Sequence, residues 1–114
     1  MQNTTKDILK VLYPVRPAEV KKYDYGLMVV IGGSDFYSGS PALVSLAGFR
    51  AGVDMVRVIA PKRAADIIAS FSPILAAYPI ANSHILQDDL AMLLSLPQAA
   101  KEVSRGRVSV VIGG

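Results

Sequence analysis

The sequence contains no cysteine, which excludes disulfide bonds and thiol catalysis. It contains no tryptophan and one histidine, His84, which follows Asn82-Ser83 in a stretch typical of a solvent-exposed turn. Its only adjacent carboxylates, Asp88 and Asp89, would point about 100° apart on a helix and would not converge on one metal ion. The sequence therefore predicts no metal site, and we assign no catalytic residue within it.

Charge is also sparse, because Asp, Glu, Lys and Arg make up 18% of the residues and the net charge is +3. The adjacent basic pairs are Lys21-Lys22 and Lys62-Arg63, and a nucleic-acid surface needs a denser patch, so we expect no nucleic-acid partner. Long apolar runs are missing too, since the stretch 27–31 is far shorter than the roughly 20 residues of a membrane helix. The first residues show no signal-peptide pattern, so we expect a cytoplasmic protein without membrane contact.

What the sequence does contain is an alternation of apolar runs and helical patterns, typical of an α/β protein with a mainly parallel sheet. The run 27–31 is continuously apolar, which predicts a strand covered on both faces. Pro79 places the strand 74–80 near an edge of the sheet. The expected strands are 27–31, 54–60, 74–80 and 108–112, and the expected helices are 6–12, 41–52, 61–71, 87–96 and a further helical turn over 97–105.

Two expectations concern how the helices pack. Leu43, Leu46, Ala47 and Arg50 fall at helical spacing, as do Leu90, Leu93 and Leu94 in a later helix, and we expect both sets to face inward. Gly48 interrupts the first pattern and predicts close packing on the sheet. Residues 1–114 are expected to form one domain, with 1–26 as an N-terminal helix and lead-in; the chain stops after the fourth strand, so we expect an incomplete domain.

The stretch most suggestive of a ligand site runs from Val29 to Pro41, where an apolar strand enters two glycines, a hydroxyl-rich loop and a helix. Backbone amides at such a helix N-terminus can face an anion. The loop matches neither G-x-G-x-x-G nor G-x-x-x-x-G-K-[ST], so a dinucleotide fingerprint and a Walker loop are not supported, and a plain tight turn stays an alternative. The first and last strands both end in Gly-Gly, which predicts that both border one crevice.

Taken together, several short motifs resemble the ADP/ATP-dependent NAD(P)H-hydrate dehydratases, whose pattern is close to K-G-D-x-G, a strand ending in G-G-S, x-x-Y-x-G-A-P and a helix ending in R-A-G. The corresponding stretches here are residues 22–26, 29–34, 37–41 and 50–52. The resemblance covers nearly the whole chain but only the N-terminal half or so of the family's domain. It implies a ribokinase-like three-layer α/β/α fold, truncated after about the fourth strand.

The resemblance also implies a function: removal of water from the S-epimer of NAD(P)H hydrate, with ADP or ATP and Mg²⁺ as cofactors, by phosphorylation of the hydrate hydroxyl and elimination. A cytoplasmic homo-oligomer is implied as well. Carried over to this sequence, the substrate-binding residues are Gly33, Ser34, Tyr37, Gly39, Ser40 and, at the start of the family's second loop, Gly114.

Four departures from the family pattern bear on this interpretation. Ser40 replaces an alanine that touches the substrate, Tyr23 replaces the glycine of K-G-D, Asp54 replaces a small residue, and Gly114 stands where proline is usual. The family's aspartate base is not among these residues, so we expect the 114-residue chain alone to be inactive. The alternatives are a small-alcohol or sugar kinase of the ribokinase-like group and a non-catalytic nucleotide-binding domain.

Overall fold

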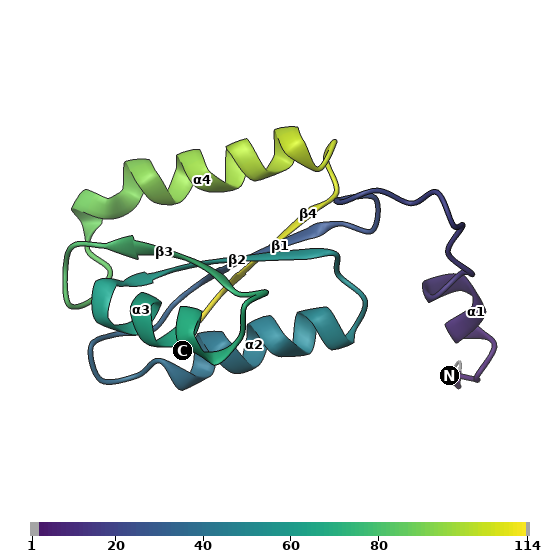
Figure 1. Ribbon diagram of the computed structural model, residues 1–114, viewed down its shortest axis with the longest axis horizontal. Coiled ribbons are helices and arrows are strands. Elements are labelled where there is room, and N and C mark those ends of the chain that lie inside the picture. Colours follow the sequence, from purple (N-terminus) through teal and green to yellow (C-terminus); the bar gives the residue numbers. More distant parts are fainter. Residues whose placement is uncertain (1–2, 114) are drawn as a thin grey trace.

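The computed structural model describes residues 3–113 and contains one four-stranded parallel sheet within that range. The elements follow one another as the alternating pattern predicts, which confirms the α/β class (Figure 1). They are α1 (Ile8–Leu12), β1 (Leu27–Ile31), α2 (Gly39–Arg50), β2 (Met55–Pro61), α3 (Lys62–Phe71), β3 (Ala76–Ile80), the 3₁₀ turn η1 (Gln87–Asp89), α4 (Leu90–Val103) and β4 (Val108–Ile112).

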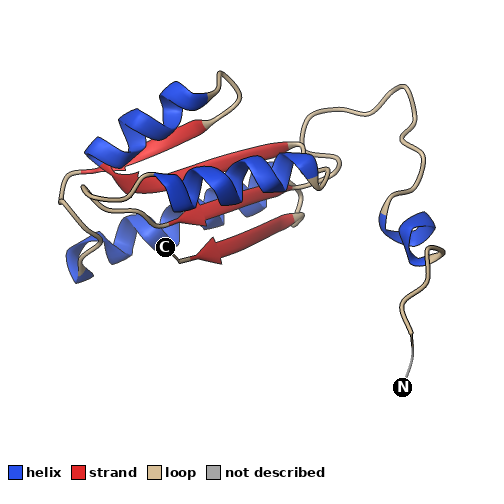
Figure 2. Ribbon diagram, turned by 90° about the horizontal axis from the view of Figure 1, so that it is seen from below, coloured by secondary structure: helices blue, strands red, loops and turns tan. Residues whose placement is uncertain are grey.

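The sheet winds in two directions from β1. Its strand order is β3-β2-β1-β4, so the chain first moves outward through β2 to β3 and then returns to the other side of β1. Helices α2 and α3 cover one face of the sheet and α4 crosses the opposite face, which gives three layers (Figures 1 and 2). In open parallel sheets, ligands bind beyond the carboxyl ends of the strands where the winding changes direction, and here that point is the end of β1.

Strand β1 lies at the centre of the core, and all five of its residues are buried. Met28 and Val30 belong to the apolar cluster beneath α2 and α3, whereas Leu27, Val29 and Ile31 belong to the cluster beneath α4. A strand that contributes to two apolar layers cannot alternate between apolar and polar residues. The continuous apolar run in the sequence is therefore explained by burial on both faces, as predicted.

The two edge strands differ in character. Strand β3 carries Pro79 and pairs only with β2 among the described strands, which agrees with the expected edge position. Strand β4 pairs with β1 from Val108 to Ile112, yet its side chains are largely exposed and Ile112 is 75% exposed. In the part of the chain that the structure describes, β4 is thus an apolar and accessible edge of the sheet.

The packing of α2 differs from the sequence-based prediction. Its buried residues are Pro41, Ala42, Ser45 and Gly48, whereas the expected inward residue Leu43 is 71% exposed. Small residues face the sheet because the helix approaches it closely: a Cβ at Gly48 would lie 2.3 Å from Cε of Met28. Ser45 is tolerated there because its hydroxyl donates a hydrogen bond of 2.6 Å to the Pro41 carbonyl.

Helix α4 also corrects the prediction, since one helix spans Leu90–Val103 with Pro97 inside it. Residues 87–89 form a 3₁₀ turn rather than the first turn of that helix. Of the leucines expected to face inward, Leu93 packs against the core, but Leu90 and Leu94 are exposed. No helix within residues 3–113 has both the length and the apolar character needed to cross a bilayer.

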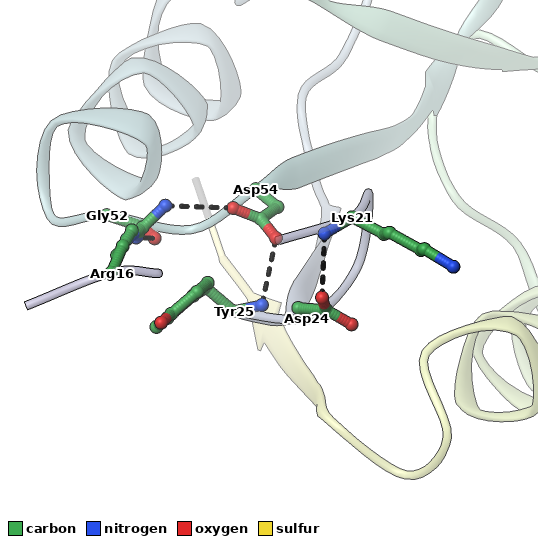
Figure 3. A network of polar contacts seen from close by, with 6 residues as sticks. All are labelled: Arg16, Lys21, Asp24, Tyr25, Gly52 and Asp54. Atoms are coloured by element: carbon green, nitrogen blue, oxygen red, sulfur yellow. Dashed lines mark hydrogen bonds and ion pairs between the residues drawn. The ribbon is translucent and has the colours of Figure 1, made fainter. Parts of the chain in front are cut away.

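The lead-in to β1 is tied to the amino-terminal edge of the sheet (Figure 3). Arg16 donates to Asp54 at 3.0 Å and also to the Gly52 carbonyl, and its guanidinium lies 3.9 Å from the Tyr25 ring centroid. The second oxygen of Asp54 accepts a 2.8 Å hydrogen bond from the Tyr25 amide. Asp54 therefore replaces a small residue of the family pattern with an anchor for the lead-in.

Candidate functional site

The candidate site is the loop of residues 32–38, which joins the end of β1 to the start of α2 at the carboxyl edge of the sheet. A tight turn closes it: the Ser34 amide donates to the Tyr37 carbonyl at 2.9 Å, and the Tyr37 amide donates back at 3.2 Å. The Ser34 hydroxyl oxygen accepts from the amides of Phe36 and Tyr37, each at 3.2 Å. The turn is thus held by its own backbone and by one serine side chain.

The outward surface of this turn is aromatic. Phe36 is 90% exposed and Tyr37 is 70% exposed, with ring centroids 6.4 Å apart. The two rings are inclined at 43° to each other, so they do not form one flat surface. Together they present apolar area beside the polar groups of the loop, against which a ligand can pack.

Two glycines of the loop are required by the fold itself. Gly33 has a φ of +85°, and a Cβ there would lie 3.0 Å from the Tyr37 carbonyl oxygen. A Cβ at Gly32 would lie 2.1 Å from the Gly113 carbonyl oxygen, and the Gly113 amide donates to the Ile31 carbonyl at 3.1 Å. Gly32 and Gly113, the first glycines after the first and last strands, therefore meet side by side; that the two ends border one crevice stays a prediction.

Gly39 is different, because nothing in the described structure explains its lack of a side chain. A Cβ at Gly39 would have no atom within 4 Å among the described residues. Gly39 and Ser40 open α2, where the first amides of a helix have no intrahelical acceptor, and both residues are exposed. Open space beside unpaired amides is what close approach of a ligand requires.

The loop is also held from outside by residues that follow the next two strands. The Asp35 amide donates to the Ser83 carbonyl at 2.9 Å, and the Asp35 carbonyl accepts from the Arg63 guanidinium. An open pocket of about 490 Å³ lies beside these contacts. Its lining includes Asp35, Lys62, Arg63, Asp66, Asn82 and Ser83.

The predicted substrate-binding residues Gly33, Ser34, Tyr37, Gly39 and Ser40 therefore lie together at one edge of the sheet. Helix α2 begins at Gly39 rather than at Pro41, so Ser40 belongs to its first turn instead of to the loop. Gly114 lies outside the described residues. That these residues bind substrate stays a prediction, because it rests on the resemblance and the loop's position.

Sequence reasoning misses the residues that support the loop. The local pattern indicates surface charge at Arg63 and a plain turn at Ser83, yet both residues contact Asp35. The contacts could have been predicted only from the positions of the two residues. Both come shortly after strands, and the carboxyl ends of parallel strands meet at one edge of the sheet. His84 is exposed in the same turn, with its Nδ1 2.9 Å from the Ser83 hydroxyl, as expected of a turn residue.

The described residues contain no ready-made cluster of metal ligands. Within residues 3–113, no three His, Asp or Glu side chains lie close enough together to hold a metal ion. Asp88 and Asp89 do not converge, because Asp89 is buried and accepts a 2.8 Å hydrogen bond from the amide of Leu86, which directly precedes η1, whereas Asp88 is exposed. The chemistry assigned to these residues below therefore involves no metal ligand from this part of the chain.

Comparison with known proteins decides the family. A protein-family model described as NAD(P)H-hydrate dehydratase matches residues 28–110. The chain belongs to this family. The match begins within β1 and ends within β4, so it includes the whole candidate loop and parts of every strand pairing of the sheet. The resemblance inferred from the loop motifs is confirmed.

Individual relatives carry related descriptions. The chain is 40% identical over 91 residues to the bifunctional NAD(P)H-hydrate repair enzyme Nnr of Pyrobaculum aerophilum, covering 80% of this chain and 18% of the relative. It is 31% identical over 103 residues to the ADP-dependent (S)-NAD(P)H-hydrate dehydratase of Nitrosopumilus maritimus, covering 90% and 36%. It is 35% identical over 86 residues to the ATP-dependent (S)-NAD(P)H-hydrate dehydratase of Neurospora crassa, covering 73% and 24%. The chain thus spans between about a fifth and about a third of these relatives.

The structure gives a reason for one departure from the NAD(P)H-hydrate dehydratase pattern. Tyr23, which stands where K-G-D has glycine, adopts a φ of +74°. Glycine reaches this left-handed region without penalty, whereas for other residues it costs roughly 1–2 kcal/mol. Tyr23 offsets part of that strain by packing against the cluster beneath α4, and its hydroxyl lies 3.4 Å from the Arg57 guanidinium.

Proposed function

We propose that this chain contributes the substrate-side loop for ADP- or ATP-dependent dehydration of (S)-NAD(P)H hydrate. The observation that carries the proposal is the loop itself: a family-matched turn at the carboxyl end of the central strand, with open space at Gly39 and exposed aromatic rings at Phe36 and Tyr37. The names of the relatives supply the substrate and the nucleotide.

Each loop residue receives a role in this proposal. Tyr37 and Phe36 provide exposed apolar surface against which the hydrated nicotinamide ring, which is not aromatic, packs. The amides of Gly39 and Ser40 face polar groups of the substrate, and Gly39 lets the backbone come close. The Ser40 hydroxyl replaces a methyl group at this surface, so it adds one hydrogen-bond donor and acceptor toward the substrate.

The loop contains one carboxylate, Asp35, and the family resemblance places the base for the hydrate hydroxyl at an aspartate that is not among these residues. Asp35 is exposed, and both of its backbone groups are used in holding the loop. Deprotonation of a hydroxyl before phosphoryl transfer needs a positioned base. We therefore assign binding and positioning to these residues, and predict that the 114 residues alone do not turn over NADH hydrate.

The proposal is tested by thermal shift and calorimetry on the purified chain. We expect NADH hydrate to raise the melting temperature and to bind, whereas hydroxyethylthiazole and ribose do not. The Tyr37→Ala variant should bind NADH hydrate roughly tenfold more weakly, because loss of the apolar area that this side chain buries against the substrate costs about 1.4 kcal/mol. Tyr78→Ala, an exposed tyrosine on β3, is the matched control and should bind normally.

The outcomes separate the alternatives. Stabilisation by a sugar or a thiazole alcohol in place of NADH hydrate would favour a small-alcohol kinase. Stabilisation by ATP or ADP alone, with no response to NADH hydrate, would favour a non-catalytic nucleotide-binding domain. The cytoplasmic location, the homo-oligomer and the requirement for Mg²⁺ belong to the same proposal, supported by the family resemblance.

A further inference from the structure

Arg63 links the candidate loop to the rest of the sheet edge. It lies in the first turn of α3, directly after β2, and its Nη1 donates to the Asp35 carbonyl 28 positions earlier in the chain. The Asp35 amide is held by the Ser83 carbonyl, which follows β3. The amide and the carbonyl of Asp35 are thus both held, by Ser83 after β3 and by Arg63 after β2.

The neighbouring cation makes no such contact. Lys62 lies beside Arg63 in the same turn of α3, and its ammonium pairs with Asp66 at 2.6 Å within the helix. Both side chains line the 490 Å³ pocket and both are exposed. They differ in their partner, since only Arg63 of the two contacts the loop, so Lys62 offers a matched comparison.

We propose that Arg63 is a positioning residue for the substrate-side loop. Its guanidinium fixes the Asp35 carbonyl and thereby the direction in which Phe36 and Tyr37 leave the turn. This inference rests on the proposed function, because it concerns how the loop receives NAD(P)H hydrate.

The physical reason is that the turn is otherwise held mainly by hydrogen bonds within itself. The internal bonds of Ser34 and Tyr37 define the shape of the turn but not its direction relative to the sheet. The start of the loop is fixed by the Gly32 amide, which donates to the Ile59 carbonyl at 3.1 Å, and the direction of the turn beyond it comes from the two outside contacts at Asp35. Loss of the Arg63 contact leaves a loop that keeps its turn but populates several orientations, and binding is reduced by the fraction that is no longer competent.

The first measurement is hydrogen exchange, followed by mass spectrometry, of the peptide covering residues 32–41 in ligand-free protein. We expect Arg63→Gln to accelerate exchange of the Asp35 amide, which bonds to Ser83 outside the turn, about fivefold, whereas the amides of Ser34 and Tyr37, which bond within the turn, keep their protection. Lys62→Gln should leave the exchange unchanged. Unchanged exchange in Arg63→Gln would overturn the inference.

The second measurement is the dissociation constant of NADH hydrate by calorimetry. Arg63→Gln should raise it about fivefold, Lys62→Gln should not change it, and Arg63→Lys, which keeps a cationic donor, should recover part of the loss. Melting temperatures of all three variants should match that of the parent. Faster exchange in Arg63→Gln with an unchanged dissociation constant would overturn the positioning role. A loss of affinity in Arg63→Gln that Arg63→Lys does not partly recover would also overturn it.

The two measurements keep the two proposals apart. If the parent chain does not bind NADH hydrate, the proposed function fails, and the substrate half of this inference fails with it. The exchange experiment needs no ligand, so in that case it still decides whether Arg63 holds the loop.

Discussion

The glycines of the loop differ in what the fold requires of them. Gly32 is crowded by the Gly113 carbonyl and Gly33 has a left-handed backbone, so both are needed for folding. Gly39 has neither constraint. A glycine that the fold does not need, placed at the first position of a helix, points to a requirement outside the fold.

The Gly39→Ala variant should therefore separate stability from binding. Alanine at an unstrained helical position raises the free energy of unfolding by about 0.5–1 kcal/mol. The added methyl group occupies the open space, so NADH hydrate should bind about tenfold more weakly. Chemical denaturation and calorimetry measure the two effects; Gly33→Ala is the contrast, since it should lower both stability and affinity. A Gly39→Ala protein that binds as tightly as the parent would contradict the role of this open space.

Asp24 gives a pH dependence of stability at the opposite edge of the sheet. The Lys21 amide donates to it at 2.7 Å, and this hydrogen bond, with a further contribution from Arg105, lowers the pKa of Asp24 below its ordinary value of 3.8. A carboxyl whose pKa is lowered on folding stabilises the protein above that ordinary value, and the contribution is lost as the pH falls through the lowered pKa.

We expect Asp24→Asn to be less stable than the parent near pH 7 and the difference to shrink below about pH 4. Urea unfolding of both proteins across this range provides the measurement. A difference that grows as the pH falls would contradict the assignment.

At the scale of elements, the meeting of β1 and β4 depends on bare backbone at Gly32. A side chain there collides with main-chain atoms of Gly113, which cannot rotate away as a flexible side chain can. The ends of the two strands, and with them the start of the loop, are therefore set by this contact.

Gly32→Ala should separate the carboxyl ends of β1 and β4. We expect the free energy of unfolding to fall by about 3 kcal/mol, at the upper end of overpacking effects. Loss of exchange protection at the Gly113 amide, which bonds to Ile31, would locate the change. Gly106→Ala serves as a control for a strained glycine without a steric neighbour. Retained protection at Gly113 in Gly32→Ala would show that the strands adjust without separating.

The sequence alone correctly predicts a feature of the fold when that feature depends on one physical constraint. The continuous apolarity of β1 predicts burial on both faces, and Gly48 predicts close packing on the sheet, because each signal reflects one physical constraint. The predicted buried face of α2 is wrong because the helix lies so close to the sheet that only small side chains fit between them. Ser45 therefore faces inward and Leu43 faces outward. The contact of Arg63 escapes prediction because its partner lies far away in the chain, and periodicity reports only local neighbours.

At the scale of the whole molecule, β4 is an exposed, apolar edge of the sheet in the part of the chain that the structure describes. It pairs with β1 on one side, and Val110, Val111 and Ile112 are exposed. An accessible apolar edge strand is a template for pairing with another chain. We therefore expect the 114-residue chain to self-associate through this edge.

The Val110→Lys variant should shift the population toward monomer, because a charge on an edge strand opposes pairing. Sedimentation velocity at several concentrations measures the change. Leu43→Lys, at an apolar and more exposed position on α2, is the control and should sediment as the parent does. A sharp monomer boundary for the parent chain would contradict the expectation.

The anchoring of the lead-in by Asp54 and Arg16 has a practical consequence. It fixes the lead-in at the amino ends of the strands, and α1 stands apart from the sheet on that side, whereas the loop of residues 32–38 lies at the carboxyl ends (Figure 1). A surface tether or a fluorophore attached at α1 would therefore leave the loop facing free solution. Immobilised-protein assays built in this way should report ligand affinities undisturbed by the support.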